Sequence, residues 1–218
     1  MLHHSVTFGH PRLNEPAPEF RATTTHGVRA LEDYAGKWLV LFSHPADFTP
    51  VCTSEFVAFA EAHECFQSIG CELLGLSVDS VYSHIAWLRN IEEKFGVAVH
   101  FPIIADASME VARAYGMIHP SESDTASVRS VFVIDPDGFV RAILQYPMTT
   151  GRSVSEILRL VQALSASAEH GVATPEGWKH GEKGLAKAPA TVEEADRRTV
   201  GAKDVVDWYF ERKRIPLE

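Results

Sequence analysis

Large apolar residues in the first 168 positions follow two alternating spacings, one typical of strands and one typical of helices. Short, mainly apolar runs of strand length lie at residues 38–43 and 73–78. Each run is followed by a stretch with large side chains at helical spacing, first residues 54–69 and then residues 82–95. A strand followed by a helix, repeated along the chain, predicts an α/β fold.

The same spacing predicts which side of each helix faces the core. In the helix over residues 54–69, the expected core side chains are Phe56, Phe59, His63 and Phe66. In the helix over residues 82–95, which Gly96 is expected to end, they are Ile85, Leu88 and Ile91. Both helices are therefore expected to flank the sheet that the apolar runs build.

The rest of this region predicts a hairpin and a final helix. Residues 131–134 and 140–146 have the composition of two strands. The tight turn between them, Asp135 to Gly138, ends in a glycine that can take a positive φ. Residues 153–168 carry aliphatic side chains on one helical face. The sum is a mixed sheet flanked by helices.

Beyond residue 168 the composition changes. Residues 170–190 are rich in glycine, proline and lysine and hold few large apolar side chains, which indicates an extended arm. The end of the tail carries apolar side chains that are hard to keep in water, namely Val205, Val206, Trp208, Tyr209 and Phe210. They are expected to pack on a partner subunit, or else back on their own domain. We therefore divide the chain into a domain over residues 1–168 and an arm over residues 169–218.

Composition and charge narrow the compartment and the partners. The chain has 218 residues, of which 45% are hydrophobic and 22% charged, as in an ordinary globular protein. Residues 1–170 hold 11 basic against 20 acidic residues and carry the whole formal charge of −9, while residues 171–218 hold nine of each. This acidity argues against nucleic acid or an anionic membrane as a partner. Three cysteines and no long apolar segment predict a cytoplasmic protein.

The candidate chemistry lies in the segment Pro45-Ala-Asp-Phe-Thr-Pro-Val-Cys52, at the junction of a strand and a helix. If Thr49 is the N-cap, Pro50 takes the first helical position and Cys52 falls in the first turn. Free backbone N–H groups and the positive end of the helix dipole favour a thiolate there. Cys52 is therefore a candidate nucleophile. The alternative is that Cys52 is a small, buried apolar side chain without a chemical role. Capping geometry alone favours the two interpretations equally.

The motif Pro45-x-x-x-Thr49-x-x-Cys52 resembles the active-site motif of the peroxiredoxins, the thiol peroxidases of the AhpC/TSA family. The longer string SHPADFTPVCTSEF is similar to that of their one-cysteine subfamily. Further similarities follow in the same order: Arg129 in SVRSVFVIDPDG, Arg152 in TTGRSVSEILR, and a tail ending in DWYFERKRIP. An eight-position motif with a downstream arginine is far more specific than an isolated cysteine.

The resemblance runs from about residue 7 to the C-terminus, and it implies both fold and activity. The implied fold is a thioredoxin-like mixed sheet with an extended C-terminal arm. The implied activity is the reduction of hydrogen peroxide and organic hydroperoxides, without cofactor or metal, in a homodimer or a larger ring. No Cys/His spacing in the chain resembles a closed zinc site.

The resemblance also implies a role for each motif residue. Cys52 would attack the terminal peroxide oxygen and become a sulfenic acid. Arg129 would hold the thiolate and the polarised O–O bond, because a guanidinium is always charged and donates several hydrogen bonds. Thr49 would hydrogen-bond the peroxide, and Pro45 would shield the sulfur.

Three further residues are expected to support this site. Glu55, three residues after Cys52, would orient a guanidinium through charge-assisted hydrogen bonds. Arg152 would belong to the same arrangement, and His44 matches a subfamily histidine that contacts the site. The alternatives are an ordinary first-turn glutamate for Glu55 and a structural histidine for His44, and for Arg129 a surface arginine at the start of a strand.

The sulfenic acid must then be reduced. Cys65 lies 13 residues after Cys52 in the predicted helix, about 20 Å along its axis, too far for a disulfide without unwinding. Cys71 follows that helix, and residues 72–218 contain no cysteine. These positions favour an external thiol or thiol protein as the reductant. The alternative, that Cys65 or Cys71 of another subunit resolves Cys52, stays open.

Two other functions compete with a peroxidase. A thiol–disulfide oxidoreductase of thioredoxin type requires Cys-x-x-Cys, but Thr49 and Glu55 occupy the positions three residues from Cys52. A peroxide sensor or holdase chaperone would use the same cysteine as a signal, and turnover with a supplied thiol separates it from an enzyme.

Overall fold

The computed structural model describes residues 10–198 and 201–216. The two predicted domains also include residues 1–9, 199–200 and 217–218, which lie outside the described residues. Among the helices of the described chain, none combines the length and the apolarity that a membrane span requires.

The described chain divides into two compact units, and the boundary along the chain lies between Val154 and Ser155. The division predicted from the sequence, after residue 168, places the last long helix with the first part instead. The division into a peroxidase-type domain and an arm after residue 168 therefore stays a prediction.

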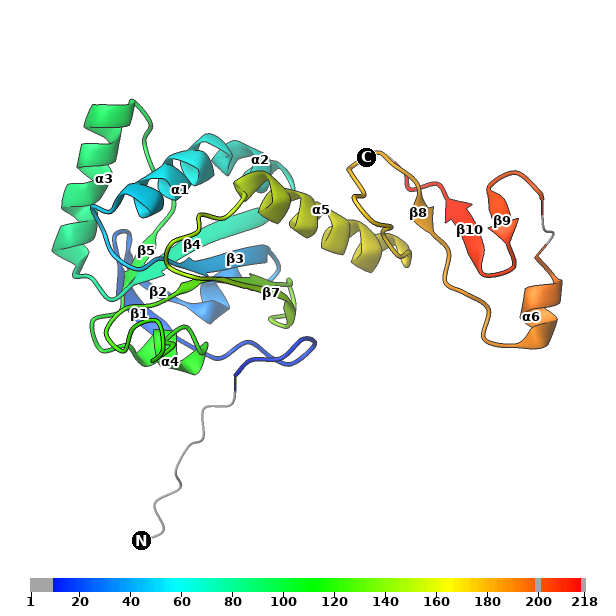
Figure 1. Ribbon diagram of the computed structural model, residues 1–218, viewed down its shortest axis with the longest axis horizontal. Coiled ribbons are helices and arrows are strands. Elements are labelled where there is room, and N and C mark those ends of the chain that lie inside the picture. Colours follow the sequence, from blue (N-terminus) through cyan, green and yellow to red (C-terminus); the bar gives the residue numbers. More distant parts are fainter. Residues whose placement is uncertain (1–9, 199–200, 217–218) are drawn as a thin grey trace, which may run out of the picture. The chain divides into compact units, whose positions relative to one another are not determined.

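A seven-stranded mixed sheet forms the first unit, with the strand order β2-β1-β5-β4-β3-β6-β7 (Figure 1). The strands are β1 (Arg21–Thr24), β2 (Gly27–Ala30), β3 (Trp38–Ser43), β4 (Cys71–Ser77), β5 (Ile103–Ala105), β6 (Arg129–Ile134) and β7 (Val140–Tyr146). β4 runs parallel to both β3 and β5, whereas β6 is antiparallel to β3 and to β7. Every residue of β3 is buried, which explains its unbroken apolar run.

The helices of the first unit are α1 (Pro50–Glu61), α2 (His63–Ser68), α3 (Val81–Phe95), α4 (Glu110–Ala114) and a short 3₁₀ helix, η1 (Leu31–Tyr34). The prediction of one helix over residues 54–69 is wrong, because α1 and α2 are separate. Ala62 lies between them with φ −88° and ψ −3°, in the right-handed helical region but far from the ψ of about −42° of a regular α-helix. No glycine or proline marks this break, so the sequence did not reveal it. The predicted core face of this segment is nevertheless buried.

Helix α3 ends at Gly96 as predicted and begins one residue before the predicted start, but its buried face differs. Gly96 ends it with φ 70°, the left-handed conformation that glycine tolerates best. The face turned to the core carries His84, Trp87 and Ile91, while Ile85 is exposed. The spacing of aliphatic residues predicted the wrong face because it counts histidine as polar. His84 is nevertheless buried, with its own hydrogen-bond partners.

The second unit contains α5 (Val154–His170), which begins one residue before it, and a small C-terminal sheet. The sheet has the strand order β8-β10-β9, with β8 (Gly184–Leu185), β9 (Val205–Asp207) and β10 (Phe210–Lys213), and α6 (Val192–Asp196) precedes β9. Trp178 is 1% exposed and clusters with Ala163 and Ala166 of α5. The glycine-rich segment thus contributes a core side chain that its composition does not reveal.

Candidate active site

Cys52 lies in the first turn of α1 and is completely buried. Thr49 is the N-cap residue with extended backbone angles, φ −105° and ψ 148°, and Pro50 takes the first helical position as predicted. The first intrahelical bond runs from the N–H of Thr53 to the carbonyl of Thr49, at 2.9 Å. The N–H groups before Thr53 therefore have no intrahelical acceptor, and the positive end of the helix dipole lies at the sulfur.

The loop before α1 turns sharply to bring the helix to this position. Phe48 has φ 55°, a left-handed conformation that is uncommon for a bulky residue, and its side chain is exposed. The hydroxyl of Thr49 does not cap the helix but donates to the carbonyl of Ala46 at 2.8 Å. Its oxygen keeps lone pairs that can accept a further hydrogen bond. Pro45 is buried in the same loop.

Arg129, the first residue of β6, reaches the sulfur from the sheet. Its Nη1 donates to Sγ of Cys52 at 3.4 Å and to Oε2 of Glu55 at 2.8 Å. Its Nε and Nη2 donate to the carbonyl oxygen of Met148 at 2.9 and 2.8 Å. Because both edges of the guanidinium are occupied, its plane is fixed, with one N–H directed at the sulfur.

Glu55 joins Arg129 to a second buried arginine. Arg152 donates from Nε to Oε1 of Glu55 at 2.9 Å and from Nη2 to Oε2 at 2.7 Å, and its backbone N–H donates to Oε1 at 2.7 Å. Its Nη1 donates to the carbonyls of Ser43 and Ser130, both at 2.9 Å. Burial acts to raise the pKa of Glu55, but the hydrogen bonds and charges of the two arginines outweigh it and hold that pKa below its ordinary value.

This group of two arginines and one carboxylate has a net charge of +1, if Glu55 is ionised, beside the cysteine. A positive field at the sulfur stabilises a thiolate and attracts an electron-rich oxygen substrate. The arrangement can therefore support nucleophilic attack by sulfur.

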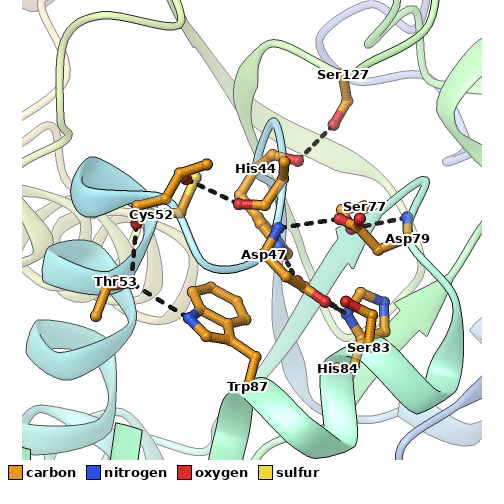
Figure 2. Close-up of polar contacts among 12 residues, drawn as sticks. His44, Asp47, Cys52, Thr53, Ser77, Asp79, Ser83, His84, Trp87 and Ser127 are labelled. Carbon is orange, nitrogen blue, oxygen red and sulfur yellow. Dashed lines mark hydrogen bonds and ion pairs between the residues drawn. The ribbon is translucent and has the colours of Figure 1, made fainter. Parts of the chain in front are cut away.

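His44 belongs to a separate buried cluster on the other side of the loop (Figure 2). Its Nε2 lies 3.0 Å from Oδ1 of Asp47, and Nδ1 of His84 lies 3.0 and 2.9 Å from the two oxygens of Asp47. Nε2 of His84 lies 3.2 Å from the carbonyl of Ile104. The backbone N–H of Asp47 also donates to Asp79, at 3.0 Å.

The cluster offers three ligand atoms within 4.8 Å of one another, a spacing that could hold a metal ion. Hydrogen bonds already account for that spacing, because each imidazole is paired with a carboxylate oxygen of Asp47. The residues thus do not require a metal, and the prediction of a metal-free site stays a prediction.

Four of the seven predicted site residues are directly hydrogen-bonded to one another: Cys52, Arg129, Glu55 and Arg152. The other three lie in the loop before α1: His44, Pro45 and Thr49. Sequence reasoning missed Asp47, His84 and the carbonyl of Met148. Asp47 lies inside the recognised motif, so its position in the sequence could have revealed it. The carbonyl of Met148 could not be found in this way, because every residue has a backbone carbonyl.

The other two cysteines differ sharply in exposure. Cys65 is exposed, while Cys71 is buried at the start of β4. Burial raises the pKa of the Cys71 thiol, which makes it a poor nucleophile. All three cysteines are free.

A helix N-terminus that presents a cysteine, packed on a mixed sheet with a guanidinium on the sulfur, defines a thioredoxin-fold thiol enzyme. Residues 13–143 match the AhpC/TSA family, and residues 163–199 match the C-terminal domain of 1-Cys peroxiredoxin. The chain belongs to the AhpC/TSA family, the peroxiredoxins, and is a thiol-dependent peroxidase.

Curated relatives match this chain along nearly its full length and theirs. A peroxiredoxin from Aquifex aeolicus is 51% identical over 216 residues, which cover 94% of this chain and 97% of the relative. Peroxiredoxin 2 from Thermoplasma acidophilum is 50% identical over 198 residues, covering 91% and 98%.

Solved structures support the fold class predicted from the sequence. A yeast mitochondrial 1-Cys peroxiredoxin matches with a TM-score of 0.82 and 38% identity, covering 93% of this chain and 99% of that one. A variant of peroxiredoxin 6 from Arenicola marina matches with a TM-score of 0.82 and 34% identity, covering 95% and 99%. The thioredoxin-like α/β fold is thereby confirmed.

Proposed function

We propose that this peroxidase reduces hydrogen peroxide and organic hydroperoxides through a sulfenic acid at Cys52, which an external thiol resolves. The observation that carries the proposal is the contact of 3.4 Å between Nη1 of Arg129 and Sγ of Cys52. It joins the cysteine at the helix N-terminus to a fixed cation, which is the combination that nucleophilic sulfur requires.

In the first step, the Cys52 thiolate attacks the terminal oxygen of the peroxide. The S–O bond forms as the O–O bond breaks, sulfur loses two electrons, and the departing oxygen takes a proton to leave as water or alcohol. Arg129 is positioned to stabilise the negative charge that moves from sulfur to the leaving oxygen. Thr49 offers its hydroxyl oxygen as an acceptor for the peroxide proton, and Pro45 closes the pocket beside the sulfur.

The remaining site residues hold these groups in place. Glu55 and Arg152 fix Arg129 through the buried ion cluster. His44 is proposed to contact the site from the loop before α1. Because Arg129 is held through the Met148 carbonyl as well, the donor is pre-organised before the peroxide arrives.

The second step needs a thiol from outside the chain. The thiol sulfur attacks the Cys52 sulfenic acid, water leaves, and a mixed disulfide forms, which a second thiol reduces to regenerate Cys52. Burial of Cys71 and the lack of any cysteine after it support this route. The solved yeast relative is described as resolved through glutathione and thioredoxin systems.

We further propose that the protein is cytoplasmic and works as a homodimer or a larger ring. The support for association is the exposure of Val206, Trp208 and Tyr209 near the end of the chain, at 58%, 46% and 54%. Large apolar side chains at such exposure favour an interface.

Steady-state peroxide consumption with supplied glutathione, and separately with thioredoxin, tests the one-cysteine cycle. We expect turnover by the wild type and by the Cys65→Ser/Cys71→Ser double variant, and none by Cys52→Ser. Loss of turnover in the double variant would contradict resolution by an external thiol. Stoichiometric oxidation without turnover would favour a peroxide sensor.

A further inference from the structure

A polar pocket lies in the first unit, at the end of the sheet away from Cys52. Its volume is about 370 Å³, and its lining includes His26, Arg29, Tyr34, Lys37, Glu72 and His100. Lys37 directly precedes β3, whereas the loop that leads to Cys52 follows β3. The six residues of β3 rise about 3.3 Å each, so the pocket lies about 20 Å from that loop. The proposed peroxidase chemistry uses none of its residues.

The pocket gathers basic side chains on an acidic part of the chain. Residues 1–170 carry the whole formal charge of −9, yet His26, Arg29 and His100 meet here from the β1–β2 turn, from β2 and from the segment before β5. Burial, and then the positive charges of Arg29 and His100, lower the pKa of His26, so the three groups lie close enough to repel one another. Such a group is unfavourable unless a negative charge offsets it.

The carboxylates of the pocket already have partners. Oε1 of Glu72 accepts from Nζ of Lys37 at 2.6 Å, and Oδ2 of Asp33 accepts from the last backbone N–H of β2 at 2.8 Å. Among the described residues, Arg29 makes only a hydrogen bond of 3.3 Å, to the carbonyl of the residue before it, and His100 makes none. The groups that remain for a ligand are therefore mainly donors.

Tyr34 adds a donor that lacks an acceptor. Its side chain is 8% exposed, and its hydroxyl is buried without a hydrogen-bond partner among the described residues. Burial raises the pKa of Tyr34 to about 12, so the hydroxyl keeps its proton, and an unpaired buried donor is costly. The charges that act on this phenol belong to Arg29, Glu72 and Asp33, which all line the pocket. Tyr34 also borders a hollow beside Phe139, but no carboxylate peculiar to that hollow is among these charges.

These donors favour an anion over a metal ion. A metal ion requires deprotonated ligands, whereas a guanidinium and a protonated phenol offer only N–H and O–H groups. Among the described residues, the one group of side chains with metal-ligand spacing is that of His44, Asp47 and His84, outside this pocket. A phosphate group has at least three acceptor oxygens that point in different directions, which suits donors on separate segments better than a planar carboxylate does. The volume of the pocket also leaves room for a small substituent on the phosphate.

We propose that this pocket binds a phosphate group, free or as the ester of a small polar molecule, through Arg29, His26 and His100, with the hydroxyl of Tyr34 as a further donor. Each imidazole can offer an N–H in either of its charge states. The proposal does not depend on the peroxidase cycle, because it uses no residue of the Cys52 site.

Isothermal titration calorimetry at constant ionic strength tests binding directly, with inorganic phosphate and glycerol 3-phosphate as probes and glycerol as the uncharged control. We expect saturable binding of one phosphate group per chain and none of glycerol. Tighter binding of glycerol 3-phosphate would identify an ester as the ligand, and equal affinities would identify free phosphate. No saturable binding of either phosphate overturns the proposal. Saturable binding of Zn²⁺ in their place would indicate a metal site and overturn it as well.

Two variants test the residues. Tyr34→Phe removes only the hydroxyl, so phosphate should bind about tenfold more weakly, as expected for loss of one hydrogen bond to a charged group. The ligand-free variant should unfold at a temperature no lower than the wild type, because the hydroxyl has no partner there. Arg29→Gln should weaken binding at least as much. Wild-type affinity in both variants would place the anion elsewhere and overturn the proposal.

Arg21→Gln is the matched control for lost charge. Arg21 lies on the neighbouring strand β1, is exposed and does not line the pocket. This variant should bind phosphate with wild-type affinity. An equal loss of affinity in Arg21→Gln and Arg29→Gln would mean that phosphate responds to overall charge and not to this pocket, which contradicts the proposal.

NMR of the histidine rings during a phosphate titration locates the anion without any peroxide turnover. The signals of His26 and His100 should move with the calorimetric affinity. The signal of His119, which does not line the pocket, should stay in place. Movement of His119 with His26 and His100 unchanged would show binding elsewhere and overturn the proposal.

Discussion

A single guanidinium nitrogen, Nη1 of Arg129, donates to both a sulfur and a carboxylate, and this nitrogen lies at the centre of the site. The family resemblance predicted both residues of this contact. Local sequence patterns could not connect them, because Cys52 and Arg129 lie 77 residues apart. It could not predict how Arg129 is fixed. Its other edge binds the carbonyl of Met148, and any residue type has a carbonyl.

Arg129→Ala should slow the first oxidation of Cys52 by roughly a hundredfold or more, as loss of one pre-organised donor to a developing charge does in other enzymes. Stopped-flow measurement of the reaction with a single equivalent of hydrogen peroxide gives this rate. Arg113→Ala, which removes an exposed arginine from α4, serves as the control and should react at the wild-type rate. Equal rates in the two variants would mean that Arg129 does not stabilise the reaction.

Glu55→Gln should destabilise the protein by about 3 to 5 kcal/mol at pH 7, because it leaves two buried guanidiniums without their anion. The lowered pKa of Glu55 also sets a pH dependence. Its contribution is fully present above the unfolded-state pKa of about 4.3, and it is lost as pH falls through the lower folded-state value. Urea unfolding from pH 7 to pH 3 should show the two proteins converging at acid pH. Parallel curves would contradict a buried, ionised Glu55.

At the scale of elements, the periodicity found most of the long strands and helices but not their interruptions. The sequence placed Pro50 at the start of α1 because proline has a strong positional preference, whereas Ala62 between α1 and α2 has none. On α3 the spacing of apolar residues predicted that Ile85 faces the core. The buried face instead includes His84, whose hydrogen-bond partners Asp47 and Ile104 are distant in sequence. Short strands such as β1 and β5, which lie inside the sheet, depend on tertiary pairing and gave no local signal.

Gly96→Ala should destabilise the protein by about 1 kcal/mol, because alanine must adopt φ 70° at the end of α3. Space is not the reason, since an added Cβ would meet nothing within 4 Å. Urea unfolding measures the change, and Gly96→Asn provides the comparison because asparagine tolerates the left-handed region better. A loss in the asparagine variant as large as in the alanine variant would argue against a conformational cause.

At the scale of the whole molecule, two compact units carry different features: the first holds the cysteine site and the second holds the exposed aromatic side chains of the tail. Charge follows a similar division, since the acidic excess lies in residues 1–170. The sequence revealed this contrast in composition. It did not reveal that Trp178 supplies a core to the second unit, because a single tryptophan among glycines and lysines has no periodic context.

Trp178→Ala should destabilise the second unit by about 3 to 5 kcal/mol through loss of a fully buried side chain. Hydrogen exchange should show the loss of protection in α5 and β10, with protection of β3 and β4 unchanged. A uniform loss across both units would indicate that the whole chain unfolds cooperatively.

The central claim is that Cys52 is the peroxidatic residue, and mapping of its sulfenic acid tests this most directly. The protein is treated with one equivalent of hydrogen peroxide in the presence of a carbon nucleophile specific for sulfenic acid, and the adduct is located by mass spectrometry. The account predicts rapid labelling at Cys52 and none in Cys52→Ser. Rapid labelling at Cys65 or Cys71 instead would contradict it.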